Sequence, residues 1–380
     1  MAKPTPRATP WASASTATRT SKIRIVIVDR GPQRLEFRIP FADPNPFRRP
    51  PMSRTIKFAK AGGPDVLEFT ESAVTAPGPN EVRIKVKAIG INRAESMWRQ
   101  DDYIEPVVYP AGLGYEAAGT VDALGSAVRD LTVGDAVSVI PSFSMNQYHT
   151  YGEVILVPDY AVVKHPDSLT FVEAASVWMM FITAYGALIE DAKVTKGDYV
   201  VIPAASSSVG LAALQIANYA GATTIALTRS SAKRAQLLDA GATHVIATEE
   251  TNLLEEIKSI TGGKGVRVVF DPVGGETFAT LVSALSFGGI AFIYGALSPE
   301  PTTIPVLEMI AKVVTVKAHN IWLTSGDETR RKAAVEFVSK GLASGALKPV
   351  IDRVFAFDEM LDAHRYLEQN GQFGKIVVTL

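Results

Sequence analysis

The residues from Ala205 to Gly210 have the composition of a phosphate-binding turn. They read Ala-Ser-Ser-Ser-Val-Gly, and no bulky side chain follows until Leu211. Small residues allow a tight turn whose backbone N–H groups point at a phosphate, and the positive end of a following helix strengthens the site. Only the last glycine of a G-x-G-x-x-G pattern is present, so two interpretations stand. Either Ser206, Ser207 and Ser208 donate to a pyrophosphate, or a serine caps a helix and no ligand binds.

The segments around this turn predict the elements that would position it. An apolar, β-branched run at 199–202 precedes the turn and indicates a buried strand. A helical pattern follows over 209–220, Gly221 ends it, and a second apolar run occupies 225–227. Strand, turn, helix and strand in this order form a mononucleotide-binding βαβ unit.

The same alternation continues along the chain. We expect strands at 199–202, 225–227, 244–246, 266–270 and 291–294, with helices at 209–220, 231–240, 252–261 and 275–287 between them. Strands spaced about 20–25 residues apart with intervening helices predict an α/β fold with a Rossmann-type, doubly wound parallel sheet. A phosphate turn that heads such a sheet favours a nucleotide site over an empty capped turn.

The rest of the chain has a different pattern of apolar residues. Short alternating runs with Gly/Pro turns from 56 to about 163 predict a mostly β unit, and a helical pattern covers 171–188. We expect a further helix at 328–344 and strand-like runs at 353–357 and 375–380, which lie outside the parallel sheet. We therefore expect a mostly β catalytic domain over 52–170, completed by about 317–380, and a nucleotide-binding domain over 171–316.

Residues 1–51 stand apart in composition. They hold ten Lys/Arg and three Asp/Glu, which leaves 28 basic against 36 acidic residues in the remainder. Residues 1–22 are rich in Ser, Thr, Ala, Pro and basic residues, a composition that transit peptides have, but the prolines at positions 4, 6 and 10 oppose an amphipathic helix. We expect a disordered or spurious extension, with translation starting at Met52. The acidic remainder argues against a nucleic-acid partner.

Several classes of chemistry are excluded by residue type. The chain has no Cys, which removes disulfides, thiolate nucleophiles and cysteine-based zinc sites. Its five histidines show neither H-x-x-x-H nor H-E-x-x-H spacing, so no metal site is predicted. There is no G-x-S-x-G elbow and no apolar run of the ~20 residues that a membrane helix needs.

The end of the second predicted strand indicates which cofactor would bind. NAD-binding units usually carry an acidic residue there, about 20 residues past the turn, to hold the ribose 2′-hydroxyl. Here the segment contains Arg229, Ser230 and Lys233 and no acidic residue. Two positive charges and a hydroxyl suit a 2′-phosphate, so we predict NADP(H). The alternative is that both basic residues merely lie on a solvated helix start.

Five stretches together resemble the medium-chain dehydrogenase/reductase superfamily. They are GINRAESMWRQ (90–100), AGLGYEAAGTVDALGSAV (111–128), LTVGDAV (131–137), the AASSSVG turn and GQFGKIVVTL at the C-terminus. The resemblance covers about 52–380 and is greatest to the zinc-free, quinone oxidoreductase-like branch. It implies that the mostly β domain is GroES-like.

Departures from the zinc alcohol dehydrogenase pattern concern the metal. Asn92 stands where those enzymes have a cysteine ligand, Tyr115 stands where they have the histidine of G-H-E, and the four-cysteine lobe is absent. Glu116 alone cannot hold a catalytic zinc, which needs three protein ligands. A member without this Lewis acid can still pass a hydride to an electron-poor alkene or quinone.

The resemblance also implies roles for single residues. It places Asn92 at the nicotinamide, Thr183 near the ribose and phosphates, Ser207, Ser208 and Val209 at the pyrophosphate, and Ser230 with Lys233 at the 2′-phosphate. Gly295 would lie beside the carboxamide, and Gly374 with Lys375 would form a C-terminal cofactor contact. We nominate Tyr115 as proton donor; the alternatives are that it only fills the space of the lost zinc, with solvent supplying the proton.

We therefore expect a zinc-independent, NADPH-dependent reductase of quinones or α,β-unsaturated carbonyls, cytoplasmic and without a membrane partner. The alternatives are a zinc-type alcohol dehydrogenase with a degenerate site, or a low-turnover NADPH-binding sensor or scaffold. An apolar substrate wall would include Met97, Trp98, Tyr103, Tyr109 and Phe143. The resemblance implies a homodimer; segment 302–316 is expected in the core, with the dimer interface as its alternative.

Overall fold

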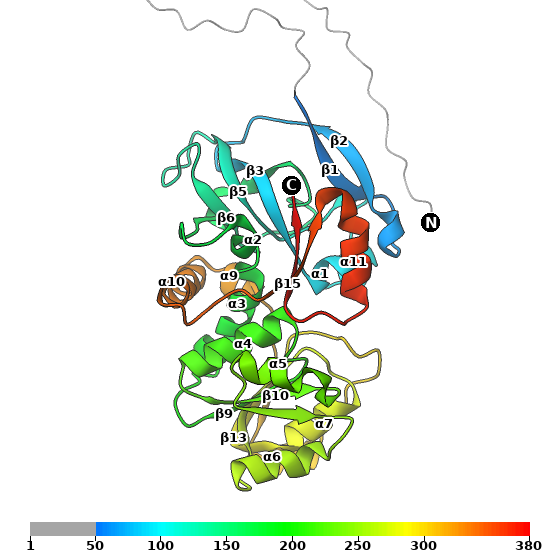
Figure 1. Cartoon of the computed structure of the whole chain (residues 1–380), viewed down its shortest axis with the longest axis vertical. Helices are drawn as coiled ribbons and strands as arrows, with labels where there is room; N and C mark the ends of the chain where they lie inside the picture. Colours follow the sequence, from blue (N-terminus) through cyan, green and yellow to red (C-terminus); the bar gives the residue numbers. More distant parts are fainter. Residues whose placement is uncertain (1–50) are drawn as a thin grey trace, which may run out of the picture. The chain divides into compact units, whose positions relative to one another are not determined.

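The computed structural model describes residues 51–380, so the predictions made for residues 1–50 lie outside the described part of the chain. A six-stranded parallel sheet contains the predicted alternating series, in the order β11-β10-β9-β12-β13-β14. Figure 1 labels its strands β9, β10 and β13 in the lower part of the view. Its strands are β9 (Tyr199–Ile202), β10 (Thr223–Thr228), β11 (His244–Ala247), β12 (Val266–Asp271), β13 (Leu285–Ile293) and β14 (Thr315–Ala318). The strand order reverses between β9 and β12, as in a Rossmann-type sheet. The predicted fold class is confirmed.

Both faces of this sheet are covered by apolar side chains. Val200 and Ile202 of β9 belong to a core cluster with Leu211 and Leu214 of the helix that follows β9. Val201 belongs to a second cluster, with helices on the other face. Alternate residues of a strand point to opposite faces, so a continuous apolar run is required here. The helices of this part are α4 (Ser208–Tyr219), α5 (Arg234–Asp239), α6 (Leu253–Thr261), α7 (Glu276–Ser283) and α8 (Val306–Lys312).

Three predicted helices differ clearly from the structure. The one expected at 231–240 is a 3-10 turn (Ser231–Lys233) followed by α5. The helix expected at 275–287 ends at Ser283, because Leu285 already pairs with Val266 at the start of β13. The pattern at 171–188 is broken into α2 (Phe171–Ala174), α3 (Trp178–Tyr185) and a π-helical turn (Gly186–Asp191). At the break between α2 and α3, the carboxylate of Glu116 from a distant strand accepts hydrogen bonds from the first amides of α3.

The remaining strands form a seven-stranded and a three-stranded sheet. The larger sheet has the order β15-β16-β3-β5-β6-β8 with β7 paired to β3, and the smaller has the order β2-β1-β4. Their strands are β1 (Met52–Phe58), β2 (Glu68–Ala73), β3 (Glu81–Ile91), β4 (Ala111–Gly112), β5 (Glu116–Leu124), β6 (Ala136–Val139), β7 (Val154–Pro158), β8 (Val162–Lys164), β15 (Ile351–Ala356) and β16 (Lys375–Thr379). The final strand β16 therefore pairs antiparallel with β3 near the start of the chain. The domain boundaries themselves stay a prediction.

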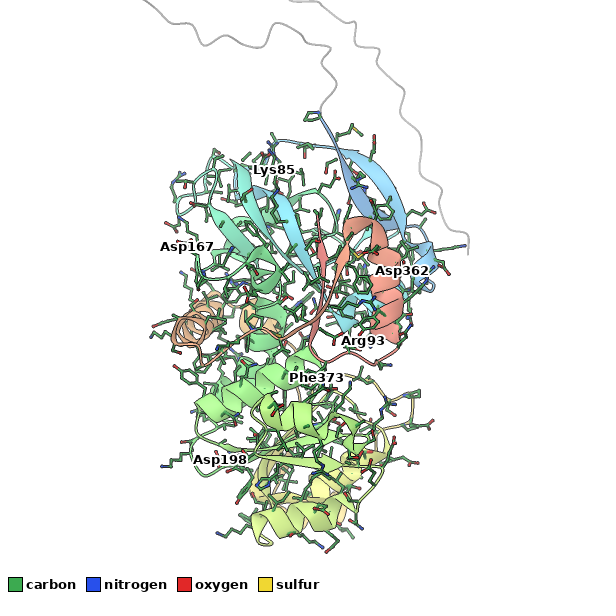
Figure 2. All side chains as sticks on the ribbon, in the orientation of Figure 1. Lys85, Arg93, Asp167, Asp198, Asp362 and Phe373 are labelled. Carbon is green, nitrogen blue, oxygen red and sulfur yellow. The ribbon has the colours of Figure 1, made fainter. Side chains whose placement is uncertain are left out.

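The other helices lie between these strands along the chain. They are α1 (Arg93–Arg99), α9 (Trp322–Ser325), α10 (Glu328–Ser344), α11 (Met360–Glu368) and four 3-10 turns (Pro64–Val66, Asp159–Ala161, Ser231–Lys233 and Phe357–Glu359). Arg93 of α1, labelled in Figure 2, donates to the carbonyl oxygen of Leu367 at the end of α11 over 2.9 Å. Helix α10 spans the residues predicted for it. No helix among the described residues combines the length and apolar composition that a membrane span requires.

We expected the apolar segment 302–316 to be buried in the core, but most of it is exposed. Helix α8 contains no buried residue, and β14 lies at the edge of the parallel sheet. Its exposed apolar side chains include Leu307 (82% exposed), Ile310 (69%) and Val313 (63%). The prediction of core burial is therefore wrong for this helix. Composition alone does not reveal the error, because exposed and buried apolar helices have the same residue types.

Candidate functional site

The serine turn begins helix α4, and its serine caps that helix. The Ser207 hydroxyl oxygen accepts a hydrogen bond from the Gly210 amide over 3.1 Å. A Cβ on Gly210 would lie 2.7 Å from the carbonyl oxygen of Ala204, so only glycine allows the helix to begin this close to the turn. The first amides of any helix lack an intrahelical acceptor, and these amides follow β9 at the strand-order reversal. The turn is thus both serine-capped and placed where nucleotides bind in such sheets.

The basic segment lies beside this turn. Ala226 of β10 pairs with Ile202 of β9, and the Ala205 amide donates to the Leu227 carbonyl over 3.2 Å. Arg229 follows directly and is exposed. Ser230 precedes the 3-10 turn Ser231–Lys233 and makes no capping hydrogen bond with its side chain. The parallel ladder therefore brings the predicted pyrophosphate and 2′-phosphate residues to the same edge of the sheet.

Lys233 is bound to protein atoms. Its ammonium group donates to Ser206 Oγ over 3.2 Å and to the carbonyl oxygens of Gly371 and Gln372 over 2.9 Å each. In the same region the Gly374 amide donates to the Ser206 carbonyl over 3.0 Å. The C-terminal segment 371–374 consequently lies against the serine turn, and Gly374 is brought together with the serines as its predicted role requires.

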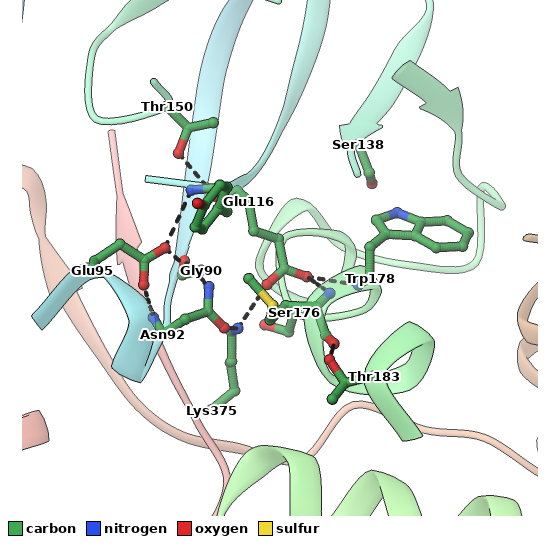
Figure 3. A network of polar contacts seen from close by, with 12 residues as sticks. Gly90, Asn92, Glu95, Glu116, Ser138, Thr150, Ser176, Trp178, Thr183 and Lys375 are labelled. Carbon is green, nitrogen blue, oxygen red and sulfur yellow. Dashed lines mark hydrogen bonds and ion pairs between the residues drawn. The ribbon is translucent and has the colours of Figure 1, made fainter. Parts of the chain in front are cut away.

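A second group of predicted residues forms a buried polar network (Figure 3). Lys375 and Glu116 pair at 2.7 Å with both side chains fully buried, and the Lys375 ammonium also donates to Asn92 Oδ1 over 2.5 Å. Burial of an ammonium is tolerated only with a counter-charge and hydrogen-bond acceptors, and both are present here. Lys375 therefore binds protein side chains in this structure, at the position where the resemblance implies a cofactor contact.

The other oxygen of Glu116 binds the start of α3. Glu116 Oε1 accepts from the amides of Trp178 over 2.6 Å and Met179 over 3.2 Å (Figure 3). These amides belong to the first turn of α3 and lack an intrahelical acceptor, so a distant carboxylate caps the helix. Thr183 lies on this helix, and its hydroxyl donates to the Met179 carbonyl over 2.5 Å. Glu116 thus links Lys375 to the helix that carries Thr183.

Glu95 connects Asn92 with Tyr115. Its carboxylate accepts from the Asn92 amide over 2.7 Å, from Asn92 Nδ2 over 3.2 Å and from the Tyr115 amide over 3.2 Å. Burial raises the pKa of Glu95 from 4.5 to about 7, against the opposing effects of the Lys375 charge and these hydrogen bonds. Complete desolvation of the carboxylate outweighs its donors. This position therefore titrates near neutral pH.

Tyr115 is fully buried among aromatic rings. Its ring centroid lies 6.0 Å from that of Phe143 and 6.5 Å from that of Tyr103. The hydroxyl has no hydrogen-bond partner among residues 51–380, and burial raises the pKa of Tyr115 above its ordinary value. The group is thus protonated at neutral pH, which a proton donor requires and which a space-filling residue also satisfies.

The predicted substrate wall is only partly assembled. Tyr103 and Phe143 flank Tyr115, and the Trp98 ring packs edge-on against Tyr103 with its Nε1 donating to the Gly112 carbonyl over 3.1 Å. Tyr109 lies elsewhere, packed edge-on against Phe58. The aromatic group is therefore built from Trp98, Tyr103, Tyr115 and Phe143.

Gly295 belongs to the neighbouring strand ends. It follows β13, and a Cβ on it would lie 2.7 Å from the Pro272 carbonyl oxygen just past β12. The buried Asp271 at the end of β12 accepts from the amides of Val273 and Gly274 over 2.9 Å each. Absence of a side chain at 295 lets the two strand ends approach closely. Gly295 thus lies on the far side of the strand-order reversal from the serine turn.

The predicted residues form two groups in the structure. Sequence reasoning gave no role in either group to Glu95 or Glu116, the two carboxylates of the second group. The first group surrounds the serine turn, and the second joins Asn92, Tyr115 and Lys375 through Glu95 and Glu116. Glu95 lies three residues after Asn92, the spacing of a helix capping box, which was the available signal. No group of three or more His, Cys, Asp or Glu side chains within 51–380 is arranged to hold a metal ion.

Replacing Lys375 by methionine removes the counter-charge of a fully buried carboxylate. We expect Lys375→Met to lower the free energy of unfolding by about 3–5 kcal/mol, as measured by chemical denaturation. Lys375→Met combined with Glu116→Gln should recover part of the loss, because Gln still offers an oxygen to the α3 amides. As control, Lys340→Met breaks an exposed pair with Glu336 and should change stability little. Equal effects at Lys375 and Lys340 would contradict the structural importance of the buried pair.

The raised pKa of Glu95 predicts a pH-dependent stability. Between pH 4.5 and about 7 the folded protein holds a proton that the unfolded chain has released, so this contribution to stability falls as pH rises. Relative to Glu95→Gln, the wild type should lose on the order of 3 kcal/mol from pH 5 to pH 8, since one pKa unit corresponds to about 1.4 kcal/mol. Denaturation of both proteins across this range tests it. A constant difference would show that Glu95 titrates normally.

Comparison with known proteins identifies the family. A model of the alcohol dehydrogenase GroES-like domain matches residues 78–167, and a model of the zinc-binding dehydrogenase family matches residues 208–340. A quinone oxidoreductase of Salmonella typhimurium is 32% identical over 327 residues, which cover 85% of this chain and 98% of the relative. The motif resemblance found in the sequence is therefore confirmed over nearly the whole described part.

Solved structures agree with this assignment. The Escherichia coli quinone oxidoreductase complexed with NADPH has a TM-score of 0.79 and 29% identity, covering 86% of this chain and all of that chain. An NAD-dependent alcohol dehydrogenase has a TM-score of 0.77 and 29% identity, covering 86% of this chain and 99% of that chain. Together with the Rossmann-type strand order and the serine turn, these matches show that the chain belongs to the medium-chain dehydrogenase/reductase superfamily, in its quinone oxidoreductase-like branch.

Proposed function

We propose that this protein is an NADPH-dependent oxidoreductase that reduces quinones or α,β-unsaturated carbonyls without zinc. The observation that carries the proposal is the serine turn at the strand-order reversal, with the exposed Arg229 at the end of the adjacent strand. The quinone oxidoreductase relative and the NADPH-bound neighbour support the same assignment.

The residues around the turn fit a pyridine nucleotide. The amides of Ser208 and Val209 and the hydroxyls of Ser206 and Ser207 would hold the pyrophosphate. The Ser207 oxygen accepts from the Gly210 amide, so its proton remains free to donate. The hydroxyl oxygen of Thr183 keeps acceptor capacity for a ribose hydroxyl, because its hydrogen bond to the Met179 carbonyl uses only its proton. Gly295 and Gly374 would allow close backbone approach.

The residues that stand where the zinc enzymes have metal ligands support this acceptor class. When bound, NADPH supplies a hydride, and reduction of a quinone or enone then requires one proton from another source. Asn92 and Tyr115 replace ligands of the zinc enzymes, and the Asn92 oxygen is already bound to the Lys375 ammonium. This arrangement supports an acceptor that conjugation activates, with positioning as the main contribution of the protein.

Tyr115 is the side chain that we propose as proton donor. Its protonated hydroxyl lacks a partner among the described residues and lies within the aromatic group. In the alternative the hydroxyl only fills space and solvent supplies the proton. Tyr115→Phe separates the two, because it keeps the ring and removes the proton.

A panel of quinones, enones and unconjugated aldehydes and ketones, assayed with NADPH and NADH, tests the function. We expect NADPH oxidation with quinones or enones, weaker activity with NADH and none with the unconjugated carbonyls. The rate should survive chelators, and metal analysis should find no stoichiometric zinc. If Tyr115 donates the proton, Tyr115→Phe should lower kcat by about 10²-fold or more with little change in KM for NADPH.

Two outcomes would contradict the proposal. Stoichiometric zinc that is lost together with activity on chelation would indicate an alcohol dehydrogenase with a degenerate site. Tight NADPH binding without turnover of any acceptor would indicate a sensor or scaffold protein. A cytoplasmic location and the absence of nucleic-acid and membrane partners remain predictions from the sequence.

We also propose that the protein forms a homodimer through α8 and the edge strand β14. Five exposed apolar residues lie in this region: Ile304, Val306, Leu307, Ile310 and Val313. Contiguous exposed apolar side chains next to an open sheet edge are typical of an interface between chains. A second copy would cover both features.

The combined change Leu307→Glu and Ile310→Glu should convert the dimer to a monomer in light scattering after size exclusion, because it places charges in the apolar patch. Val133→Glu, at an exposed apolar residue in a turn of the β part, is the matched control and should leave the dimer intact. A wild-type monomer, or a dimer that survives the double change, would contradict this interface.

A further inference from the structure

The carboxylate of Glu105 is held in place by a neighbouring loop. Its Oε1 accepts from Ser144 Oγ over 2.5 Å and from Asn146 Nδ2 over 3.0 Å. Asn146 also binds the backbone that follows Glu105: its Nδ2 donates to the Pro106 carbonyl over 3.0 Å, and its Oδ1 accepts from the Val108 amide over 2.9 Å. These bonds join the loop after α1 to the loop after β6, so the carboxylate is held in one orientation.

The anchored carboxylate lies beside the aromatic group of the proposed acceptor site. Ser144, which binds it, directly follows Phe143, whose ring centroid lies 6.0 Å from that of Tyr115. Glu105 itself lies two residues after Tyr103. Burial and, to a smaller extent, the negative charge of Glu105 raise the pKa of Tyr103 to about 12, and both effects also act on Tyr115. Because such an effect needs short distances, the carboxylate and both phenols share one region.

The second oxygen of Glu105 has no donor of its own. Oε2 is buried, and no group among residues 51–380 donates a hydrogen bond to it. Buried polar atoms in proteins are nearly always hydrogen-bonded, since leaving one unpaired is costly. A hydroxyl group of a bound molecule can satisfy this oxygen, whereas a bound anion would be repelled by the same carboxylate.

The charges around the two phenols are mainly negative. Glu95 acts on both phenols together with Glu105. Within residues 51–380 Glu105 forms no ion pair. The ammonium of Lys375 is paired with Glu116 at 2.7 Å (Figure 3), so its charge is largely offset there. An anion that entered this region would therefore meet carboxylates without a free counter-charge beside them.

We propose that Glu105 is a specificity-determining residue of the acceptor site: its unpaired oxygen binds a hydroxyl group of the acceptor, and its charge excludes acceptors that carry a carboxylate. This inference rests on the proposed function and narrows its substrate class to uncharged quinones or enones with a hydroxyl substituent. Glu105 gives no proton or electron to the reaction. It decides which acceptor is bound beside the aromatic group.

Three enones that share a conjugated methyl ketone and differ at the other end test both parts of the proposal. They are the trans isomers of 4-oxopent-2-enoate, its methyl ester and 5-hydroxypent-3-en-2-one. The kcat/KM of each is measured with NADPH on the full chain, on Glu105→Gln and on the control Glu256→Gln, an exposed glutamate of α6. Each variant is judged by the carboxylate-to-ester and hydroxyl-to-ester ratios, because the intrinsic reactivity of the enones then cancels between variants.

Glu105→Gln should raise the carboxylate-to-ester ratio by about 10-fold or more, because it removes the repelling charge. It should lower the hydroxyl-to-ester ratio by about three- to tenfold, because a hydrogen bond to a charged oxygen becomes one to a neutral amide. The glutamine oxygen can still accept from Ser144 and Asn146, so the loop stays anchored. Glu105→Asp keeps the charge and should keep the carboxylate-to-ester ratio within about threefold of the wild type. Glu256→Gln should change neither ratio.

Binding gives a readout that does not need turnover. Dissociation constants of the three compounds are measured by calorimetry in the presence of NADP⁺, which has no hydride to transfer, on the same proteins. The chain has no Cys, so addition of a thiol to the enones does not interfere. The ratios of the dissociation constants should change in the same directions as those of kcat/KM, and thermal unfolding of each variant checks that it is folded.

Failure of the proposed function and failure of this inference are distinguishable. If the wild type reduces no quinone or enone, the proposed function fails, and the binding ratios still decide the role of Glu105. If Glu105→Gln changes all three enones by the same factor, the carboxylate only supports the loop and the inference is overturned. Ratios in Glu105→Gln that equal those of the wild type, or a Glu105→Asp variant that gains the carboxylate compound as Glu105→Gln does, overturn it equally.

Discussion

A lysine ammonium can be buried only where a counter-charge and acceptors are built around it, and the structure satisfies this constraint at Lys375. Glu116 and Asn92 provide the acceptors at 2.7 and 2.5 Å. Space for the side chain comes from Gly90, where a Cβ would lie 2.9 Å from Lys375 Cε and 2.0 Å from the Ala175 carbonyl oxygen. The groups that surround the buried Lys375 ammonium therefore connect β3, β5, β16 and the start of α3.

The same closing strand also reaches the nucleotide edge of the parallel sheet. Gly374 binds the Ser206 carbonyl, and Lys375 one residue later binds Glu116. The serine turn and the buried network are consequently tied together by two successive residues. Hydride transfer depends on holding a coenzyme and an acceptor in one geometry, and this short connection gives the proposed reductase a rigid link between the two groups.

The serine turn resolves a question that its composition leaves open. Capping and ligand binding are not exclusive at Ser207, because its oxygen accepts from Gly210 while its proton stays available. Gly210 is the one position of the glycine pattern that sterics require in this structure, since its missing Cβ would meet the backbone of Ala204 and Ala205. The turn therefore has glycine where a side chain would collide with the backbone, and it has serines at positions where hydroxyl groups can donate to a phosphate.

The sequence by itself determined the features that depend on local periodicity. The βα alternation, the parallel sheet and helix α10 follow from apolar spacing, and the motifs identify the family. Only tertiary structure decided which distant groups meet: Glu116 and Lys375 are 259 residues apart, and Lys233 bonds carbonyls 138 and 139 residues away. It also decided that α3 begins where Glu116 caps it and that α8 is exposed. Residue patterns encode local conformation, whereas partners of long polar side chains and burial of an apolar helix depend on which remote segments fold against them.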